Sequence, residues 1–147
     1  MGISDHPEAL CDFCRIVEGS ESDAWVVYED AEAMAFFPDE PVVEGHVLVV
    51  PKRHSVDIWH IDEGGACAVM KALLLLAHAI KSSLRPEGLS LVQSSGDAAG
   101  QSVFHLHFHL VPRWAEDRMG EFWPRPSPEI SDSRKSQLLA TIRSALR

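Results

Sequence analysis

The stretch SVFHLHFHLVPR, residues 102–113, constrains the fold more than any other segment, because three histidines in it alternate with apolar residues. Successive side chains of a β-strand point to opposite faces, so His105, His107 and His109 are predicted to share one face, about 7 Å apart. The Phe and Leu residues between them are predicted to pack on a hydrophobic core. We therefore expect one strand over this segment, with a polar face that carries chemistry.

Three interpretations of the histidine face compete. It could be a solvated face rich in histidine, a three-histidine metal site, or a phosphate site in which one histidine is a nucleophile. The preceding loop, residues 94–102, is small and contains glycine, so its backbone N–H groups can approach an anion closely. Gln101 and Ser102 add side-chain donors at the end of this loop. The loop and the histidines together favour an oxyanion or phosphate over a bare metal.

The remaining pattern predicts an α+β domain with a mainly antiparallel sheet. Short β-branched or aromatic runs indicate strands, and one apolar periodicity indicates a long helix that Pro86 and Gly88 end. The predicted elements are a hairpin over 25–30 and 33–37, a strand over 45–51, a helix over 66–84, a strand over 89–93 and a C-terminal helix over 133–147. We expect a single domain over residues 1–147, with a core at about 11–115 and an extension over 116–147.

Composition narrows the class of protein. The net charge of −9 disfavours binding to nucleic acid, although it leaves room for a small nucleotide held by a few local donors. No apolar run reaches the roughly 20 residues of a membrane-spanning helix, so no membrane association is expected. The three cysteines do not form a disulfide framework, and the N-terminal residues lack the pattern of a signal peptide. These features predict a cytoplasmic protein.

The stretch AGQSVFHLHFHLV resembles the signature of the histidine triad (HIT) superfamily. Two further segments resemble the same family: PVVEGHVLVVPKRH at 41–54 and the N-terminal hairpin segment at 11–37. The ending HLVPRW is more similar to the fragile-histidine-triad (Fhit-like) branch and its bacterial relatives than to the Hint branch. The resemblance implies a HIT-like fold with a five-stranded sheet, and members usually form homodimers.

The same resemblance implies a nucleotidyl hydrolase that cleaves at the α-phosphate of adenosine phosphoanhydrides or phosphoramidates through a covalent nucleotidyl-histidine. His107 matches the nucleophile, His109 the phosphate-contacting histidine and His46 an upstream histidine that supports the nucleophile's network. Ser102 and Gln101 match loop positions that touch the α-phosphate or the leaving-group oxygen. A neutral imidazole with a pKa of about 6.5 is mostly unprotonated at pH 7, which suits a nitrogen nucleophile. The resemblance implies that this catalysis requires no cofactor.

By resemblance, the base and ribose of an adenine nucleotide lie against apolar residues of the N-terminal hairpin: Phe13, Ile16 and Phe36. Two positions depart from the family pattern. Ser94 stands where Asn is usual, and Pro38 stands where Asp or Asn often meets the ribose hydroxyls. Asp39, the next residue, is expected to substitute for the missing polar group at Pro38.

Cys11 and Cys14 have the spacing of a zinc knuckle, but two ligands do not make a site. The resemblance implies that His54 and His105 complete a Cys₂His₂ structural zinc site, which would restrain the strand that presents His107. The alternative is a pair of buried thiols beside unrelated histidines.

Two other functions stay open from the sequence. The chain could be a nucleotide-binding or interaction module with little turnover, of which Ser94 and Pro38 would be symptoms. It could also be a metalloenzyme that uses all three histidines of the triad. Both alternatives keep the fold and differ from the hydrolase in what the histidines do.

Overall fold

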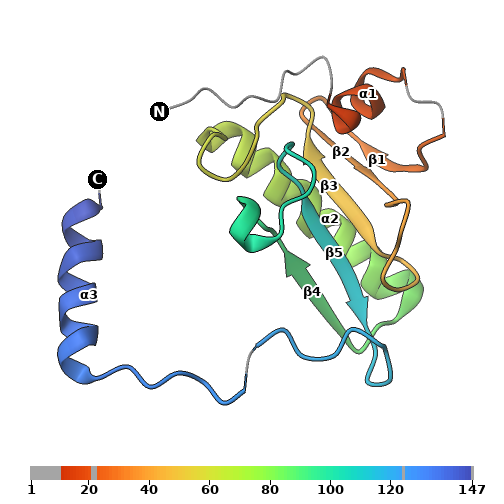
Figure 1. The fold of residues 1–147 in the computed structure, drawn as a ribbon. Helices are drawn as coiled ribbons and strands as arrows, with labels where there is room; N and C mark the ends of the chain where they lie inside the picture. The colour runs from red at the N-terminus through yellow and green to blue at the C-terminus, as the bar shows by residue number, and fades with distance from the viewer. Residues whose placement is uncertain (1–10, 21–22, 124, 147) are drawn as a thin grey trace.

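The computed structural model describes residues 11–20, 23–123 and 125–146. Five strands form one antiparallel sheet in the order β1-β2-β3-β5-β4 (Figure 1). The strands are β1 (Val26–Glu29), β2 (Ala33–Phe36), β3 (Val47–Pro51), β4 (Gly88–Val92) and β5 (Phe108–Arg113). The helices are α1 (Asp12–Glu18), α2 (Glu63–Leu84), α3 (Asp132–Ala145) and the short 3₁₀ helix η2 (Asp97–Ala99). The predicted α+β fold with a mainly antiparallel five-stranded sheet, one long helix and a C-terminal helix is confirmed.

The sheet is covered on both faces at its centre, which explains why every residue of β2 is buried. Strand side chains alternate between faces, so Ala33 and Ala35 of β2 pack toward α2. Met34 and Phe36 point the other way and pack against Phe13 of α1. The core therefore has two layers, and the thinner one under α1 borders the histidines.

Asp62 is the N-cap of the long helix α2, and its carboxylate accepts a 2.7 Å hydrogen bond from the Gly65 N–H. One face of the helix is buried against the sheet through a stripe that includes Leu73 and Leu76. By length and composition alone α2 could cross a membrane. Its packing on β2, β3 and β5 instead identifies it as the core helix of this sheet.

The predicted strand over the histidine stretch is wrong in its first half, because β5 begins only at Phe108. The groups that would continue the ladder beyond this point have other partners. The Pro51 carbonyl of β3 accepts from His105 Nε2 at 2.7 Å, and proline has no N–H to donate. The His105 carbonyl in turn faces His107 Nδ1 at 2.7 Å. Hydrogen bonds from the imidazole side chains thus take the place of backbone hydrogen bonds between strands here. Only His109 of the three histidines lies on a regular strand.

The helix α1 replaces the first part of the predicted N-terminal hairpin, so Phe13 and Ile16 lie on a helix. Cys11 is its N-cap, and its sulfur accepts a hydrogen bond from the Cys14 N–H. Gly19 ends the helix with φ of 77°, a left-handed conformation that glycine adopts without a steric penalty. These end signals are present in the sequence, but seven residues are too few to show a helical periodicity.

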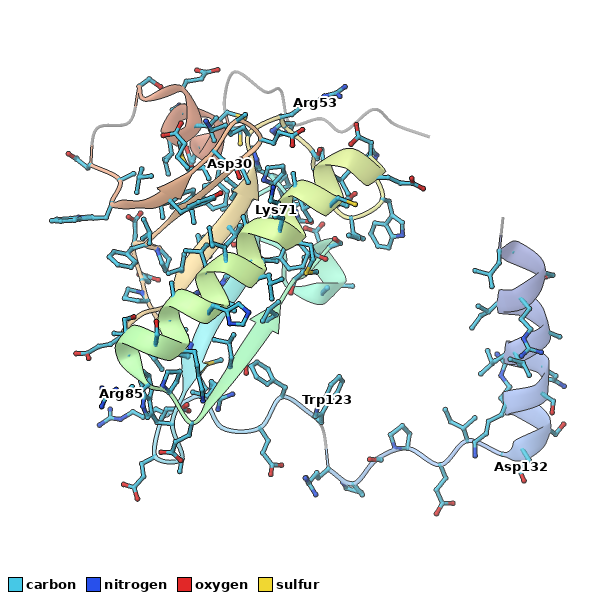
Figure 2. All side chains as sticks on the ribbon, turned by 180° about the vertical axis from the view of Figure 1, so that it is seen from behind. Asp30, Arg53, Lys71, Arg85, Trp123 and Asp132 are labelled. Atoms are coloured by element: carbon cyan, nitrogen blue, oxygen red, sulfur yellow. The ribbon has the colours of Figure 1, made fainter. Side chains whose placement is uncertain are left out.

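The C-terminal helix α3 lies apart from the sheet at the end of an extended segment (Figures 1 and 2). None of its residues is buried, and Leu139 and Ile142 are among its exposed apolar side chains. Figure 2 shows Trp123 on the connecting segment and Asp132 at the start of the helix, both away from α2. The division into a core at about 11–115 and an extension over 116–147 stays a prediction.

Candidate active site and metal centre

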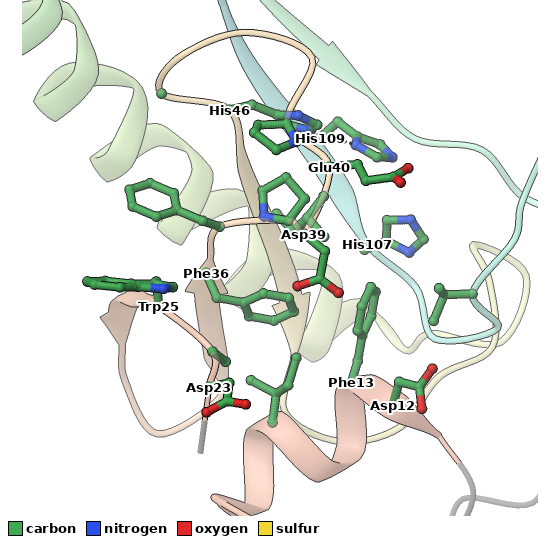
Figure 3. Close-up of a pocket in the computed structure, with 18 of the residues that line it drawn as sticks. Asp12, Phe13, Asp23, Trp25, Phe36, Asp39, Glu40, His46, His107 and His109 are labelled. Atoms are coloured by element: carbon green, nitrogen blue, oxygen red, sulfur yellow. Dashed lines mark hydrogen bonds between the residues drawn. The ribbon is translucent and has the colours of Figure 1, made fainter. Parts of the chain in front are cut away.

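A pocket of about 1050 Å³ opens on the α1 side of the sheet (Figure 3). Three histidines reach it from separate elements: His109 from β5, His107 from the segment before β5, and His46 from the residue before β3. In the register of β3 and β5, Leu48 stands opposite His109, so both point to the pocket side, while Phe108 packs toward α2. The alternation predicted from the sequence is therefore confirmed within β5.

The hydrogen bonds of His107 fix the state of its ring. Its Nδ1 lies 2.7 Å from the His105 carbonyl, which can only accept, so Nδ1 carries the proton in the neutral imidazole. The lone pair is consequently on Nε2, which has no hydrogen-bond partner among the described residues. The residue is 8% exposed and lines the pocket. Burial lowers the pKa of His107. The ring therefore stays neutral, and able to act as a nucleophile, at pH values below the ordinary pKa of histidine.

His46 and His109 form a second, directional chain of hydrogen bonds. The Val42 N–H donates to His46 Nδ1 at 3.2 Å, so the proton of neutral His46 is on Nε2. This Nε2 lies 2.9 Å from His109 Nδ1, which therefore accepts. The proton of neutral His109 is then on its Nε2, as a donor. Burial, and then the nearby rings of His107 and His46, lower the pKa of His109 to about 4.

The other wall of the pocket is aromatic and apolar. Phe13, Ile16 and Phe36 line it, as does Asp39. The ring of Phe13 meets that of His107 edge to face, with centroids 5.2 Å apart. The pocket thus combines an apolar wall with a few convergent polar groups, the usual form of a small-molecule site.

Two predicted substrate contacts lie elsewhere. Ser102 lines the pocket, whereas Gln101 and Ser94 do not. The Gln101 amide is 6% exposed and is engaged within the loop: it accepts from the Gly96 N–H and donates to the carbonyls of Val56 and Val103. The side chain therefore shapes the loop that precedes the histidines. Direct phosphate contacts by Gln101 and Ser94 stay predictions that this geometry does not favour.

Several lining residues were not predicted from the sequence. Trp25 and Val103 belong to the wall, and Glu40 and Glu44 come from the loop between β2 and β3. Loop residues have no periodicity that would assign them to a site. The position of Glu44 two residues before His46 is the one available signal.

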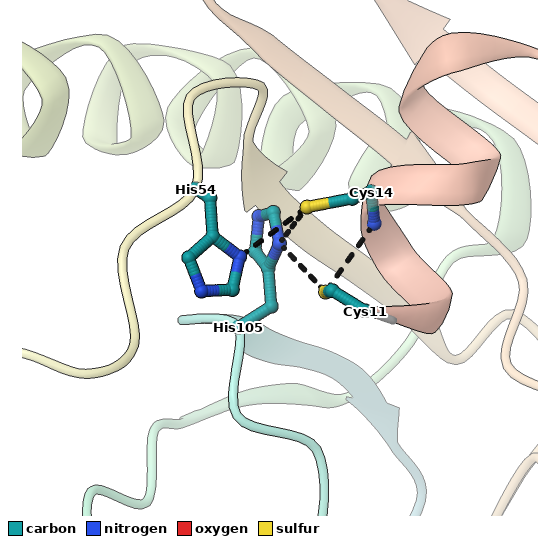
Figure 4. A group of neighbouring side chains, drawn as sticks. All are labelled: Cys11, Cys14, His54 and His105. Atoms are coloured by element: carbon teal, nitrogen blue, oxygen red, sulfur yellow. Dashed lines mark hydrogen bonds between the residues drawn. The ribbon is translucent and has the colours of Figure 1, made fainter. Parts of the chain in front are cut away.

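The second cluster joins Cys11, Cys14, His54 and His105, whose ligand atoms all lie within 4.8 Å of one another (Figure 4). His105 Nδ1 is 3.3 Å from Cys11 Sγ and 3.5 Å from Cys14 Sγ, and His54 Nδ1 is 3.2 Å from Cys14 Sγ. A tetrahedral zinc with bonds of about 2.3 Å to sulfur and 2.0 Å to nitrogen separates such ligands by about 3.5 Å. The spacing of the four side chains fits a zinc ion.

The chemistry of the donors agrees with this fit. His105 is fully buried, and its Nε2–H donates to the Pro51 carbonyl, which leaves the Nδ1 lone pair directed at the two thiols. Burial lowers the pKa of His105 to about 4, so the ring is neutral, as a ligand must be. Among the described residues this quartet is the histidine and cysteine cluster that is compact enough for a metal. His107 and His109 are not part of it, which separates the triad into two sites.

Comparison with known proteins identifies the family. The HIT domain family matches residues 19–116, and the chain belongs to this family. The protein Hit of Bacillus subtilis is 37% identical over 119 residues, which cover 80% of this chain and 81% of that one. The adenosine 5'-monophosphoramidase HNT1 of Candida albicans is 31% identical, with 83% of each chain covered. The adenylylsulfatase HINT3 of Arabidopsis thaliana is 31% identical, covering 90% of this chain and 68% of that one.

Solved structures agree with the HIT fold. A HIT family protein from Bacillus anthracis superposes with a TM-score of 0.86 at 34% identity, covering 94% of this chain and 98% of that one. A zinc-bound histidine triad family protein from Mycobacterium smegmatis superposes with a TM-score of 0.72 at 32% identity, covering 95% and 100%. The sequence relatives from Candida albicans and Arabidopsis thaliana are of the Hint type, so the assignment to the Fhit-like branch stays a prediction.

Proposed function

We propose that this protein is a nucleotidyl hydrolase that releases AMP from adenosine phosphoramidates or phosphoanhydrides by cleavage at the α-phosphate. The observation that carries the proposal is the Nε2 of His107, which has a free lone pair and no partner among the described residues, on a largely buried side chain that lines the pocket. Relatives named as an adenosine monophosphoramidase and an adenylylsulfatase support the same reaction class.

The proposed reaction has two displacements. His107 Nε2 attacks the α-phosphorus, and a nitrogen–phosphorus bond forms. The bond from phosphorus to the leaving group breaks, its electron pair goes to the leaving group, and the leaving atom takes up a proton from solvent. The proton on Nδ1 stays in place, so the adduct carries a positive ring that the His105 carbonyl at 2.7 Å stabilises. Water then attacks phosphorus and gives up a proton to solvent, the nitrogen–phosphorus bond returns its electrons to Nε2, and AMP leaves.

His109 has the role of stabilising charge on the phosphoryl oxygens. In the tautomer set by His46 its Nε2–H is a donor, and a donor oriented before the reaction costs no reorganisation in the transition state. The Ser102 hydroxyl at the pocket wall is a second candidate donor. His46 is a positioning residue, since it acts through His109.

The nucleoside half of the substrate is proposed to lie on the apolar wall. Phe13 and Phe36 pack edge to face with centroids 5.2 Å apart and, with Ile16, offer a surface for an adenine base. Asp39 lines the same wall and can accept hydrogen bonds from ribose hydroxyls. Asp39 thereby offers the polar side chain for the ribose hydroxyls that Pro38 lacks.

We propose that the quartet of Cys11, Cys14, His54 and His105 holds a structural zinc. A bound zinc would supply a rigid cross-link between α1, the segment after β3 and the segment that carries His107. Because all four positions are taken by protein side chains, the ion has no open position for a substrate. Catalysis is thus proposed to need no metal, which separates this account from a triad metalloenzyme.

Further proposals concern the setting of the protein. We propose a cytoplasmic protein of the Fhit-like branch that works as a homodimer. The edge strand β4 carries the exposed Leu89 and Leu91, and an apolar sheet edge is suited to pairing with a second copy. The separate helix α3 would then be available to a partner subunit.

Steady-state turnover tests the function. The wild type is given the phosphoramidate of AMP with a primary amine and, separately, a diadenosine polyphosphate, and AMP release is followed. His107→Ala is expected to abolish release, while His78→Ala, which removes an exposed histidine of α2, leaves it unchanged. Equal turnover by His107→Ala would overturn the proposal. Nucleotide binding without turnover in the wild type would favour the binding-module alternative.

A further inference from the structure

The charge of the pocket wall is one-sided. Five carboxylate side chains line it, and no lysine or arginine does so among the described residues. These side chains are Asp12, Asp23, Asp39, Glu40 and Glu44. Asp12 has a cationic neighbour, since its carboxylate lies 3.4 Å from an Arg15 guanidinium nitrogen. The other four have no ion-pair partner in the part of the chain that the structure describes, so their charges face the pocket without local compensation.

The acidic side chains divide between the two ends of the pocket. Figure 3 shows Glu40 on the same side as His107 and His109, whereas Asp23 lies with Trp25 beyond Phe36. Glu44 belongs to the loop that leads directly into His46. Glu40 therefore lies at the histidine end, where a phosphate would be attacked, and Glu44 lines the same pocket two residues before His46.

An independent mark of a ligand lies at that same end. The nine-tenths buried His107 points an unpartnered Nε2 into the pocket, as described above. A single phosphoryl group can be held there by neutral donors, the His109 N–H and the Ser102 hydroxyl. A leaving group with further phosphates would bring several negative charges to a wall that offers them carboxylates and no cation.

We propose that Glu40 and Glu44 select adenylyl conjugates whose leaving group carries a positive charge, such as an amine with a second ammonium group, over anionic leaving groups. The inference rests on the proposed hydrolase function and narrows its substrate class. Both side chains are exposed, so the selection acts through a screened field and weakens as salt is added. Repulsion of an anionic leaving group contributes to this selection, in addition to attraction of a cationic one.

The test uses three AMP phosphoramidates with leaving groups of equal length and different distal charge: pentanediamine, pentylamine and aminopentanoate. At low salt the wild type is expected to show a kcat/KM about 10-fold higher for the cationic than for the anionic conjugate, an energy of about 1.4 kcal/mol. The pentylamine conjugate should fall between them. Raising the salt concentration should reduce the ratio.

The variant Glu40→Gln/Glu44→Gln is expected to bring the ratio close to one. Its control is Glu116→Gln/Glu129→Gln, which removes two exposed carboxylates that do not line the pocket and changes the net charge equally. The control should keep the wild-type ratio. Turnover of all three conjugates without charge preference, or a preference that survives in the Glu40/Glu44 variant, would overturn the inference alone. No turnover of any conjugate would overturn the inference, and no turnover of the diadenosine polyphosphate either would overturn the proposed function with it.

Discussion

His46 Nε2 lies 2.9 Å from His109 Nδ1, and this contact sets which nitrogen of His109 can donate into the pocket. The direction originates in the backbone, because the Val42 N–H donates to the opposite side of the His46 ring. A histidine whose two ring nitrogens are both engaged thus fixes which nitrogen of its neighbour carries the proton. In His107 the proton is instead held on Nδ1 by the His105 carbonyl, so that its Nε2 is an acceptor. Two neighbouring imidazoles thereby present one acceptor and one donor to the same pocket.

Replacement of His46 by Phe is expected to lower kcat for AMP release by roughly 10-fold, less than the roughly 100-fold that loss of a direct donor costs. Without its partner, His109 can carry its proton on Nδ1 and present a lone pair to the phosphate. The measurement is kcat and KM for His46→Phe, His46→Gln and His109→Ala. His46→Gln, whose amide can still donate, should recover part of the activity. A His46→Phe enzyme with wild-type kcat would contradict the relay.

Acid should destabilise the folded protein through His109. Its pKa is about 4 in the fold, below the roughly 6.5 of an unfolded histidine, so the unfolded chain binds more protons between these values. The free energy of unfolding is therefore expected to fall as the pH is lowered from about 6.5 toward 4. Urea unfolding at several pH values measures it. His109→Gln, which keeps the zinc ligands, should show a shallower fall, and an equal slope in both proteins would refute this origin.

Purified protein is expected to contain about one zinc ion per chain. Cys14→Ser should lose the metal and melt roughly 5–10 °C lower, since a cross-link between α1 and the histidine segment is lost. Elemental analysis and thermal unfolding provide the readouts. Cys67→Ser is the matched control, because Cys67 is an exposed cysteine of α2 outside the quartet. Retention of zinc by Cys14→Ser would show that the ion binds elsewhere.

Stability should depend on which side of α2 is altered. Leu73 is 1% exposed and packs between the helix and the sheet, so Leu73→Ala is expected to cost about 2–5 kcal/mol of unfolding free energy. Leu74, the next residue, is 60% exposed, and Leu74→Ala should cost less than about 0.5 kcal/mol. Denaturant unfolding of the two variants gives the comparison. Similar losses for both would mean that the outer face of α2 is buried in solution.

From the sequence it was possible to predict the fold class, the order in which strands and helices follow along the chain, and the four residues of the cysteine and histidine cluster that could hold a metal. This was possible because apolar alternation and helical periodicity are local, and because the family resemblance supplied His54 and His105 as partners for Cys11 and Cys14. The start of β5 could not be predicted, since it depends on the His105 side chain taking the Pro51 carbonyl across the sheet. Such a competition between a side chain and a strand ladder leaves no trace in periodicity.

The same limit applies to the pocket. The inward position of Gln101 depends on carbonyls of Val56 and Val103 that its own sequence neighbourhood does not reveal. Glu40 and Glu44 belong to the site because the loop between β2 and β3 forms part of the pocket wall. The sequence does not reveal that these two carboxylates lack a nearby cation, because that depends on the absence of lysine and arginine from the pocket wall among the described residues.

The most direct test of the central claim is detection of the covalent intermediate. The protein is mixed with an excess of an AMP phosphoramidate, the reaction is quenched in alkali within the first turnover, and the intact mass and peptide masses are measured. The account predicts a fraction of chains heavier by one adenylyl group, located on His107 and missing from His107→Ala. Turnover with no adduct at any quench time, or an adduct on His109 or His46, would contradict it.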